Sequence, residues 1–293
     1  MAVYKRTYAA YEGSLTPSWS RFLILPRYSF ARLWQSKFLV MFFMACFFYP
    51  LGCIGYIYFA NNLSILSSFG IPAPAGQFLK VQPSLFLYFC WVQAAFTYLL
   101  TAFIGPSLVS PDLVNGAMPL YFCRPFSRTE YIAGKMSVLV FLLSLVTWVP
   151  GLILFAVQAS LAGWEWTKAN FWIAGSLFVG LMVWIVLLSL LALALSAWIK
   201  WKIAAGGLVL GVFFAGAGFG AALNSVMRTN YGTLLNLTEV MFTIWSKLFR
   251  WPSDTGISLE SAWICVAMVA AICLWLLVRR VRSARSSQRS VNS

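Results

Sequence analysis

The chain has no histidine among its 293 residues, and only 10% of its residues are charged. The absence of histidine excludes bis-His haem ligation, His-based zinc sites, and Ser-His or Cys-His nucleophilic pairs. An ordinary soluble domain has about 25% charged residues, whereas 61% of this chain is hydrophobic. The composition therefore predicts an integral membrane protein.

The long apolar runs also lack acidic and basic residues in their interiors, which argues against proton-coupled transporters, ion pumps and voltage sensors. No Walker A loop is present. The nearest sequence, Gly134-Lys135-Met136, has Thr129 where the first glycine belongs and no Ser or Thr after the lysine. We therefore expect that the chain is not an enzyme, that it has no catalytic residues, and that it binds no cofactor or metal itself.

Six apolar runs are each about as long as the 20 residues that a spanning helix needs. Strands of a membrane barrel would be about 10 residues long with alternating polarity, which these runs lack. The predicted fold is an all-α bundle of six transmembrane helices, occupying residues 38–278 between a cytoplasmic segment, 1–37, and a basic tail, 279–293. The predicted spans are Phe38–Ala60, Leu85–Val109, Met136–Leu161, Phe171–Ile199, Ile203–Leu223 and Ser261–Val278.

The distribution of basic residues predicts the topology. With both termini in the cytoplasm, the inner segments contain 16 of the 21 Lys and Arg residues and the outer loops contain five. This is the bias of the positive-inside rule. The same charges favour anionic lipid headgroups, and their spread over several sites near the membrane argues against nucleic acid as a partner.

The cysteines and the polar residues of the spans have ordinary structural interpretations. Five of six cysteines fall inside predicted spans and no CxxC pair exists, so we expect small apolar residues rather than disulfides. Gln93, Gln158 and Asn224 are expected to form hydrogen bonds between helices. Direct contact with a substrate is the alternative for these three.

The segment before the first span, 18–37, predicts an interfacial helix. Pro26 is well placed to begin it, and aromatic and leucine residues follow at helical spacing with basic residues around them. Such a helix would lie along the inner leaflet. The lipid-facing residues that we single out are Arg27, Arg32, Trp34 and Lys37.

The loop at 110–135 is the most polar part between two spans. Pro106 and Pro111 predict the end of the second span, and the order Ser110-Pro111-Asp112 predicts the start of a short helix. Residues 127–130, Ser-Arg-Thr-Glu, have the pattern of a capping box at the start of the third span. The loop is 26 residues long, whereas connections between neighbouring helices usually have about 2–8.

Two features are expected in the second half of the chain. Small-xxx-small rows, which allow close approach of helices, occur at Gly207 with Gly211 and at Gly216 with Gly220. We favour packing inside one subunit over packing between two copies. The outer segment 224–260 has apolar residues at helical spacing interrupted by three charges, which predicts a re-entrant or surface-lying helix. Trp245 and Trp251 are expected at the level of the outer headgroups.

The sequence SPDLVNGAMPLYFCRPFSRTEYIAGK, residues 110–135, resembles the corresponding loop of ABC-2 type permeases, the transmembrane subunits of bacterial ABC transporters. The shared elements are an acidic residue, a Gly-containing turn, a Leu-containing short helix, an Arg-Pro-Phe-Ser-Arg corner and a Gly-Lys pair. The layout of residues 18–280 also agrees with that family: an interfacial helix, six spans and an amphipathic outer segment.

The resemblance implies a function and a set of partners. The loop would be a coupling helix that docks into a separate ABC ATP-binding subunit, which binds ATP and Mg²⁺. A second permease copy, identical or different, would complete an exporter or lipid flippase in the bacterial cytoplasmic membrane. Glu130 has local pairing with Arg128 or Lys135 as its alternative role. The docking residues that the resemblance implies are Asp112, Asn115, Gly116, Arg124, Pro125, Arg128 and Glu130.

Two other classes remain open from sequence. A non-transporting membrane anchor of a larger complex would also lack histidine and charge within its spans, although a long patterned loop suits it less well. A secondary transporter or channel is the third class, and the chain has no internal repeat or paired broken helices in support of it.

Overall fold

A computed structural model describes residues 24–62, 80–115, 127–199, 201–252 and 255–289, and every regular element in these ranges is helical. The elements are α1 Ile24–Trp34, α2 Lys37–Ala45, α3 Phe48–Asn61, α6 Pro83–Val114, α8 Arg128–Val146, α9 Trp148–Ala162, α10 Trp164–Trp198, α11 Lys202–Met227, the 3₁₀ helix η2 Tyr231–Leu235, α12 Leu237–Leu248 and α13 Leu259–Arg289.

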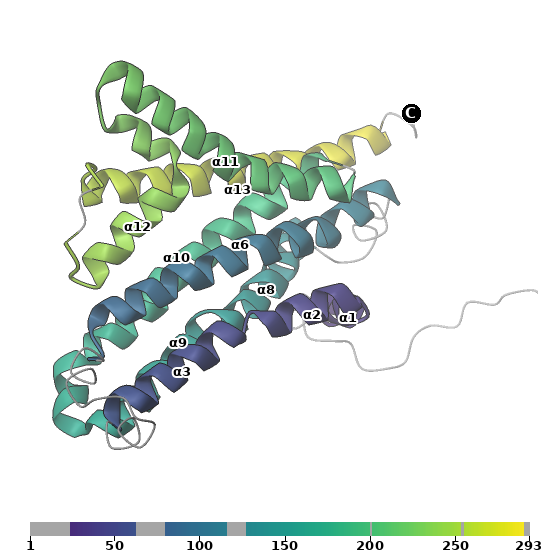
Figure 1. Cartoon of the computed structure of the whole chain (residues 1–293). Coiled ribbons are helices and arrows are strands. Elements are labelled where there is room, and N and C mark those ends of the chain that lie inside the picture. Colours follow the sequence, from purple (N-terminus) through teal and green to yellow (C-terminus); the bar gives the residue numbers. More distant parts are fainter. Residues whose placement is uncertain (1–23, 63–79, 116–126, 200, 253–254, 290–293) are drawn as a thin grey trace, which may run out of the picture.

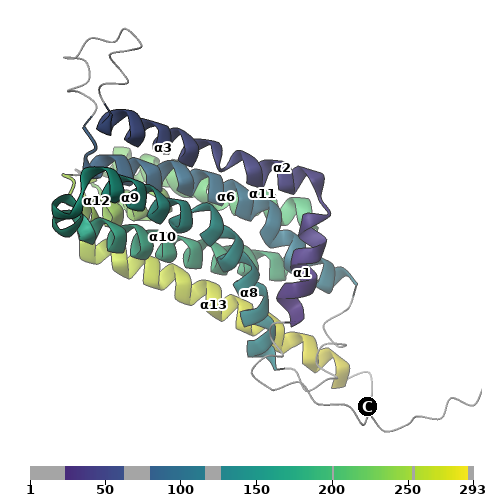
Figure 2. The same ribbon diagram turned by 90° about the horizontal axis from the view of Figure 1, so that it is seen from below.

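Six helical segments are long and apolar enough to cross a membrane, as the sequence predicted. They are Lys37–Asn61, Pro83–Asp112, Thr129–Ala162, Trp164–Trp198, Lys202–Met227 and Leu259–Arg280. The first joins α2 to α3, and the third joins α8 to α9. The segments run side by side (Figure 1), and Figure 2 shows α1 crossing their direction.

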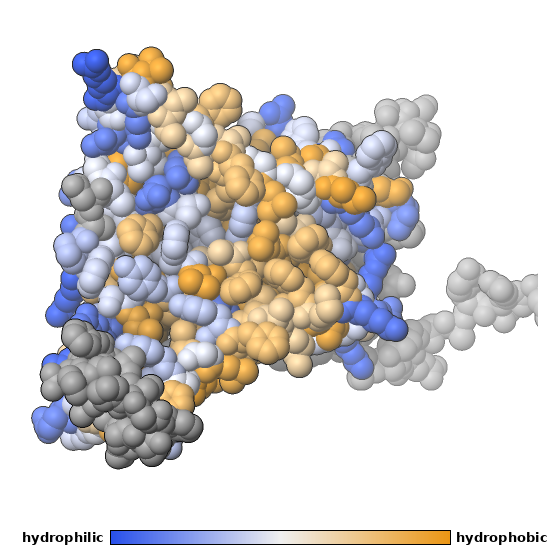
Figure 3. Space-filling model, in the orientation of Figure 1, coloured by the Kyte–Doolittle hydropathy of each residue, from blue (hydrophilic) through white to orange (hydrophobic). Residues whose placement is uncertain are grey.

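Both described ends of the chain lie at the same end of the bundle, with α1 and the last turns of α13 on the right in Figure 1. We call this the basic end. In the space-filling view a broad hydrophobic band separates it from the more hydrophilic opposite end (Figure 3). A band of this kind is what a membrane-spanning bundle presents to lipid.

Helix α10 is the central element. It packs against α6, α8, α9, α11, α12 and α13, and 72% of its most apolar 18-residue stretch is buried, against 22% for the α2–α3 segment. Side chains of α10 are therefore shielded from lipid by their neighbours, whereas the α2–α3 segment presents most of its surface outward.

Two spans break at prolines, and one glutamine joins both breaks. Pro50 and Pro150 have no backbone N–H, so the carbonyls four residues earlier, those of Cys46 and Val146, lose their helical partners. The Gln93 side-chain amide on α6 donates to both carbonyls, at 3.1 Å to Cys46 and 2.5 Å to Val146. The interhelical interpretation of Gln93 is thus confirmed.

The other two polar residues singled out within the spans also make structural hydrogen bonds. The Asn61 amide on α3 donates to the Gln158 side-chain oxygen on α9 at 2.8 Å. Asn224 accepts from the backbone N–H of Gly232 at 2.7 Å and donates to the Thr233 hydroxyl at 3.0 Å. These bonds tie α3 to α9 and α11 to η2.

Trp245, expected at the level of the outer headgroups, lies inside the bundle. Helix α12 packs against α6, α10, α11 and α13. Trp245 is 1% exposed, and its indole N–H donates to the Gly180 carbonyl of α10 at 3.0 Å. The ring fits because Gly180 has no side chain, and a Cβ there would overlap it. The apolar periodicity of α12 therefore marks a face that packs inside the bundle.

The second glycine row packs within the chain, as favoured from sequence. The carbonyl oxygens of Leu235 and Gly232 in η2 lie directly against Gly216 and Gly220 of α11, where a Cβ would overlap them. The two glycines therefore allow η2 to lie close against α11.

The first row differs from expectation. An added Cβ at Gly207 or Gly211 would have no atom within 4 Å, whereas one at the neighbouring Gly206 would overlap the carbonyl oxygen of Ala102 on α6. Close packing of α11 on α6 therefore uses Gly206, one residue away from the predicted row.

Candidate functional site

The second span does not end at its prolines. Helix α6 continues through Pro106 and Pro111 to Val114, so the prediction of a new helix starting at Asp112 was wrong. The Ser110 hydroxyl donates to the Ile199 carbonyl at the end of α10, at 3.1 Å, instead of capping a helix. Neighbouring helices can stabilise a proline-containing span in this way, and local residue patterns do not reveal them.

The extension of α6 carries Asp112 into a buried cluster with α8. Asp112 forms an ion pair of 2.9 Å with Lys135 and accepts a hydrogen bond of 2.9 Å from the Tyr131 hydroxyl. Asp112, Lys135 and Tyr131 are 9%, 5% and 1% exposed. We call these three residues the loop anchor, because they join the last turns of α6 to the first turns of α8.

The loop anchor changes the expected role of Asp112. Its carboxylate faces α8 within the chain and not outward to a partner. A buried ion pair has a large desolvation cost, which its own attraction and added hydrogen bonds must offset. The Tyr131 hydroxyl supplies such a bond, and the Lys135 ammonium also lies 5.6 Å from the centre of the Tyr131 ring.

The remaining predicted docking residues lie between or beside the two helices. Asn115 is exposed, directly after α6, and Arg128 is the first residue of α8. Gly116, Arg124 and Pro125 lie outside the described residues. The structure thus gives a surface position for Asn115 and a helix start for Arg128.

The capping box predicted for the third span is confirmed at Ser127 and Glu130. The Ser127 hydroxyl accepts from the Glu130 backbone N–H at 3.2 Å, and the Glu130 carboxylate accepts from the Ser127 N–H at 2.5 Å. The two donors at the start of α8 are satisfied reciprocally. The start of α8 is therefore fixed by local bonds as well as by the loop anchor.

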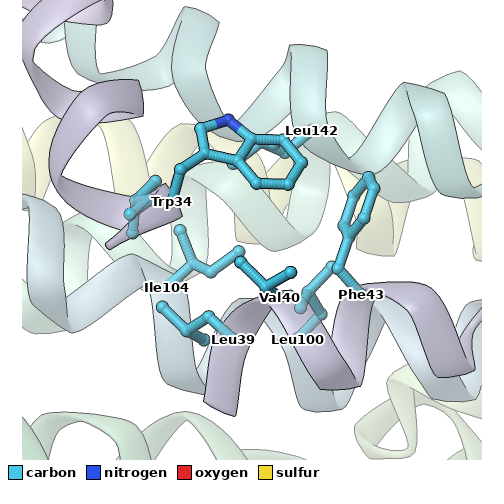
Figure 4. Close-up of a pocket in the computed structure, with 8 residues that line it drawn as sticks. Trp34, Leu39, Val40, Phe43, Leu100, Ile104 and Leu142 are labelled. Atoms are coloured by element: carbon cyan, nitrogen blue, oxygen red, sulfur yellow. The ribbon is translucent and has the colours of Figure 1, made fainter. Parts of the chain in front are cut away.

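Helix α1 is docked on the bundle at the basic end. The Phe30 ring lies edge-on to Phe141 of α8 at 5.3 Å, and the Trp34 ring lies edge-on to Phe43 of α2 at 5.7 Å. Figure 4 shows Trp34 beside an apolar crevice lined by side chains from α1, α2, α6 and α8. Helix α1 is thus attached by aromatic contacts, with Trp34 still 50% exposed.

The predicted lipid-facing cations of this helix and of the start of α2 are placed outward. Arg27, Arg32 and Lys37 are all exposed. The helices that carry them, α1 and the start of α2, lie at the same end of the bundle as the last turns of α13 (Figure 1). Their exposure agrees with the polar face expected of this segment, and contact with lipid stays a prediction.

Sequence reasoning missed Lys135 and Tyr131 as partners of Asp112. They lie 23 and 19 residues further along the chain, and no local spacing links them. The available signal was the position of each residue relative to its span. Asp112 lies in the last turn of α6 and Lys135 about two turns into α8. The two charges can meet only if the second span continues past Pro106.

Within the described ranges, no group of three or more His, Cys, Asp or Glu residues has the geometry to hold a metal ion. The five cysteines described are buried and free. Comparison of the chain with protein-family models gave no match, and no curated protein matches it.

Proposed function

We propose that the chain is the transmembrane permease subunit of an ATP-driven exporter or lipid flippase, with ATP and Mg²⁺ bound by a separate ATPase subunit. A second permease copy would complete the assembly in a bacterial cytoplasmic membrane. The residues that would meet the ATPase lie in the connection between α6 and α8. This connection leaves the bundle at the basic end, where the positive-inside rule places the cytoplasm.

The loop anchor is the observation that supports this proposal best. Asp112, Lys135 and Tyr131 join both ends of the connection at its base. A force on the connection would therefore act on α6 and α8 together. Helix α6 packs along α10 and α11, and α8 packs along α1 and α10, so the displacement would reach the centre of the bundle.

The roles within the connection follow from these positions. Asn115, Gly116, Arg124, Pro125 and Arg128 would form the docking surface. Asp112 would act indirectly, by holding the base of the connection, and Glu130 would fix the start of α8 through its capping box. This assignment moves two of the acidic residues from contact with the ATPase to positioning of the loop.

A pull-down of the tagged chain from its native membrane in mild detergent tests the proposal. We expect an ATPase subunit in stoichiometric amount from the wild type. Scrambling residues 116–126 should abolish its recovery, and scrambling residues 63–79, between α3 and α6 in the chain, should leave it unchanged. Recovery of other complex subunits without an ATPase would refute the transport role and favour a structural anchor.

A charge reversal in the same connection separates docking from folding. Arg124→Glu should reduce ATPase recovery at least tenfold while the chain still inserts and elutes as the wild type does in size exclusion. Lys80→Glu, an exposed position before α6 at the opposite end, serves as the control and should keep full recovery. Equal recovery from the two variants would contradict a docking role for Arg124.

A further inference from the structure

The basic end contains a cavity that the proposed permease role does not use. Its volume is about 250 Å³, and it lies between α1, α2, α6, α8 and α11. Three basic residues, three hydroxyls and three leucines line it: Arg32, Lys135, Lys202, Ser29, Ser36, Ser107, Leu33, Leu39 and Leu108. We call it the basic cavity.

The charge of the basic cavity is strongly unbalanced. The positive charge of Lys135 is offset, because Lys135 forms an ion pair with Asp112. Arg32 and Lys202 form no ion pair with any residue in the described ranges, and both are exposed. Two cations therefore remain uncompensated at one cavity, which favours occupation by an anion.

The lining chemistry suits a phosphate group. Arginine binds phosphate through its planar set of donors, and lysine binds it as a point charge. The hydroxyls of Ser29 and Ser36 can each donate one hydrogen bond, whereas the Ser107 hydroxyl donates to the Ile104 carbonyl at 2.6 Å. A cavity of about 250 Å³ has room for a phosphate with a substituent.

The surroundings point to a phosphate attached to acyl chains. Leu33 and Leu39 line both the basic cavity and the apolar crevice beside Trp34. Figure 4 shows the apolar crevice. Trp34, which lines that crevice, is 50% exposed, and Phe38, next to the lining residue Leu39 in the chain, is also 50% exposed. A polar cavity that opens beside an exposed apolar surface matches the two parts of a phospholipid.

We propose that the basic cavity binds the phosphate of an anionic phospholipid, with an acyl chain lying against the apolar crevice at Trp34. Basic pockets between transmembrane helices on the cytoplasmic side are a known form of site for anionic headgroups. Arg32 and Lys202 hold the phosphate from α1 and α11, while Lys135 lines the cavity and stays paired with Asp112. The site does not depend on the permease role.

Lipid titration of the purified full-length chain, delipidated in neutral detergent, tests this site. Binding of dioleoyl phosphatidylglycerol is measured by native mass spectrometry and by the rise in melting temperature. A basic residue close to an anionic lipid contributes about 1 kcal/mol, or about fivefold in affinity. Arg32→Gln and Lys202→Gln should each weaken binding by that factor, and the double variant by about 25-fold.

A matched control separates a site from diffuse attraction. Arg279 is exposed on α13, at the same end of the bundle, and α13 does not line the basic cavity. Arg279→Gln should keep the affinity for phosphatidylglycerol within about twofold, because a surface charge outside the site is screened by salt. An equal loss in Arg279→Gln, or wild-type affinity in the double variant, would overturn the proposal.

A second arm distinguishes the source of the phosphate. We expect phosphatidylglycerol to raise the melting temperature and inorganic phosphate at the same concentration to leave it unchanged. If inorganic phosphate bound as tightly, with the same sensitivity to Arg32→Gln, the lipid proposal would be overturned in favour of a soluble phosphate ligand. Because the readout is binding to the isolated chain, a failed ATPase pull-down has no effect on this result.

Discussion

The two proline breaks make a specific prediction about Gln93. Substitution by leucine keeps a side chain of similar size and removes the amide that donates to the Cys46 and Val146 carbonyls. Side-chain hydrogen bonds between membrane helices average about 0.6 kcal/mol. A buried carbonyl left without a donor costs about 1–3 kcal/mol.

Gln93→Leu should therefore lower the free energy of unfolding by about 2 kcal/mol. This value lies between the loss of two average hydrogen bonds and the cost of two fully buried, unpaired carbonyls. The cost should depend on the prolines. In a chain with Pro50→Ala and Pro150→Ala, each carbonyl regains a backbone N–H four residues later. There the same substitution should cost less than about 0.5 kcal/mol, because no carbonyl is left unpaired.

The measurement is reversible unfolding in mixed micelles, followed by tryptophan fluorescence, for the four chains of this cycle. Gln158→Leu in both backgrounds is the control. Gln158 bonds to the Asn61 side chain and not to a proline-freed carbonyl, so its cost should not change with the prolines. An equal cost of Gln93→Leu in both backgrounds would refute the bridging argument.

Three further predictions follow from the same packing. Lys135→Met should lower the free energy of unfolding by about 3–5 kcal/mol, because it leaves the Asp112 carboxylate unpaired. Adding Asp112→Asn should recover part of that loss, measured by thermal unfolding. Additive losses from the two substitutions would contradict an energetic coupling between Asp112 and Lys135. Gly220→Ala should lower the free energy of unfolding by about 1–3 kcal/mol through overpacking. Gly211→Ala, in open space, should raise it by up to about 1 kcal/mol, because alanine has the higher helix propensity. A change of the same sign for both variants would exclude the close approach of η2. Trp34→Ala should speed amide exchange in α1 at least tenfold with little change elsewhere, and unchanged exchange would show that aromatic contacts do not hold α1.

The parts of the fold that local chemistry determines were predicted from sequence. Six spans could be located because a membrane requires about 20 apolar residues in a row, whatever their neighbours are. The capping box at Ser127 and Glu130 follows from a four-residue pattern. The close packing at Gly216 and Gly220 also follows from spacing alone, although its partner, η2, could not be named.

The features that depend on distant partners were not predicted. Helix α6 continues past Pro106 because other helices surround it, and sequence rules end a helix there. Tryptophan is a residue type common at membrane interfaces. The Gly180 carbonyl, which accepts the hydrogen bond from the Trp245 indole N–H, lies 65 residues earlier in the chain, so local sequence does not reveal this contact. The loop of the candidate site was therefore predicted from the sequence, whereas the ion pair between Asp112 and Lys135 at its base was found only in the structure.

The loop anchor also limits how far the chain can extend from the bundle. Thirteen residues, 115–127, separate the end of α6 from the start of α8. A chain of that length spans roughly 45 Å at most when fully extended. The ion pair lies two residues before the end of α6 and seven residues after the start of α8, so the path from Asp112 to Lys135 through the connection is roughly 60 Å at most. The farthest residue of the connection therefore lies within roughly 30 Å of the ion pair. A protein that binds this connection must come within that distance of the loop anchor, and a cross-linker on the connection would report only contacts in that zone.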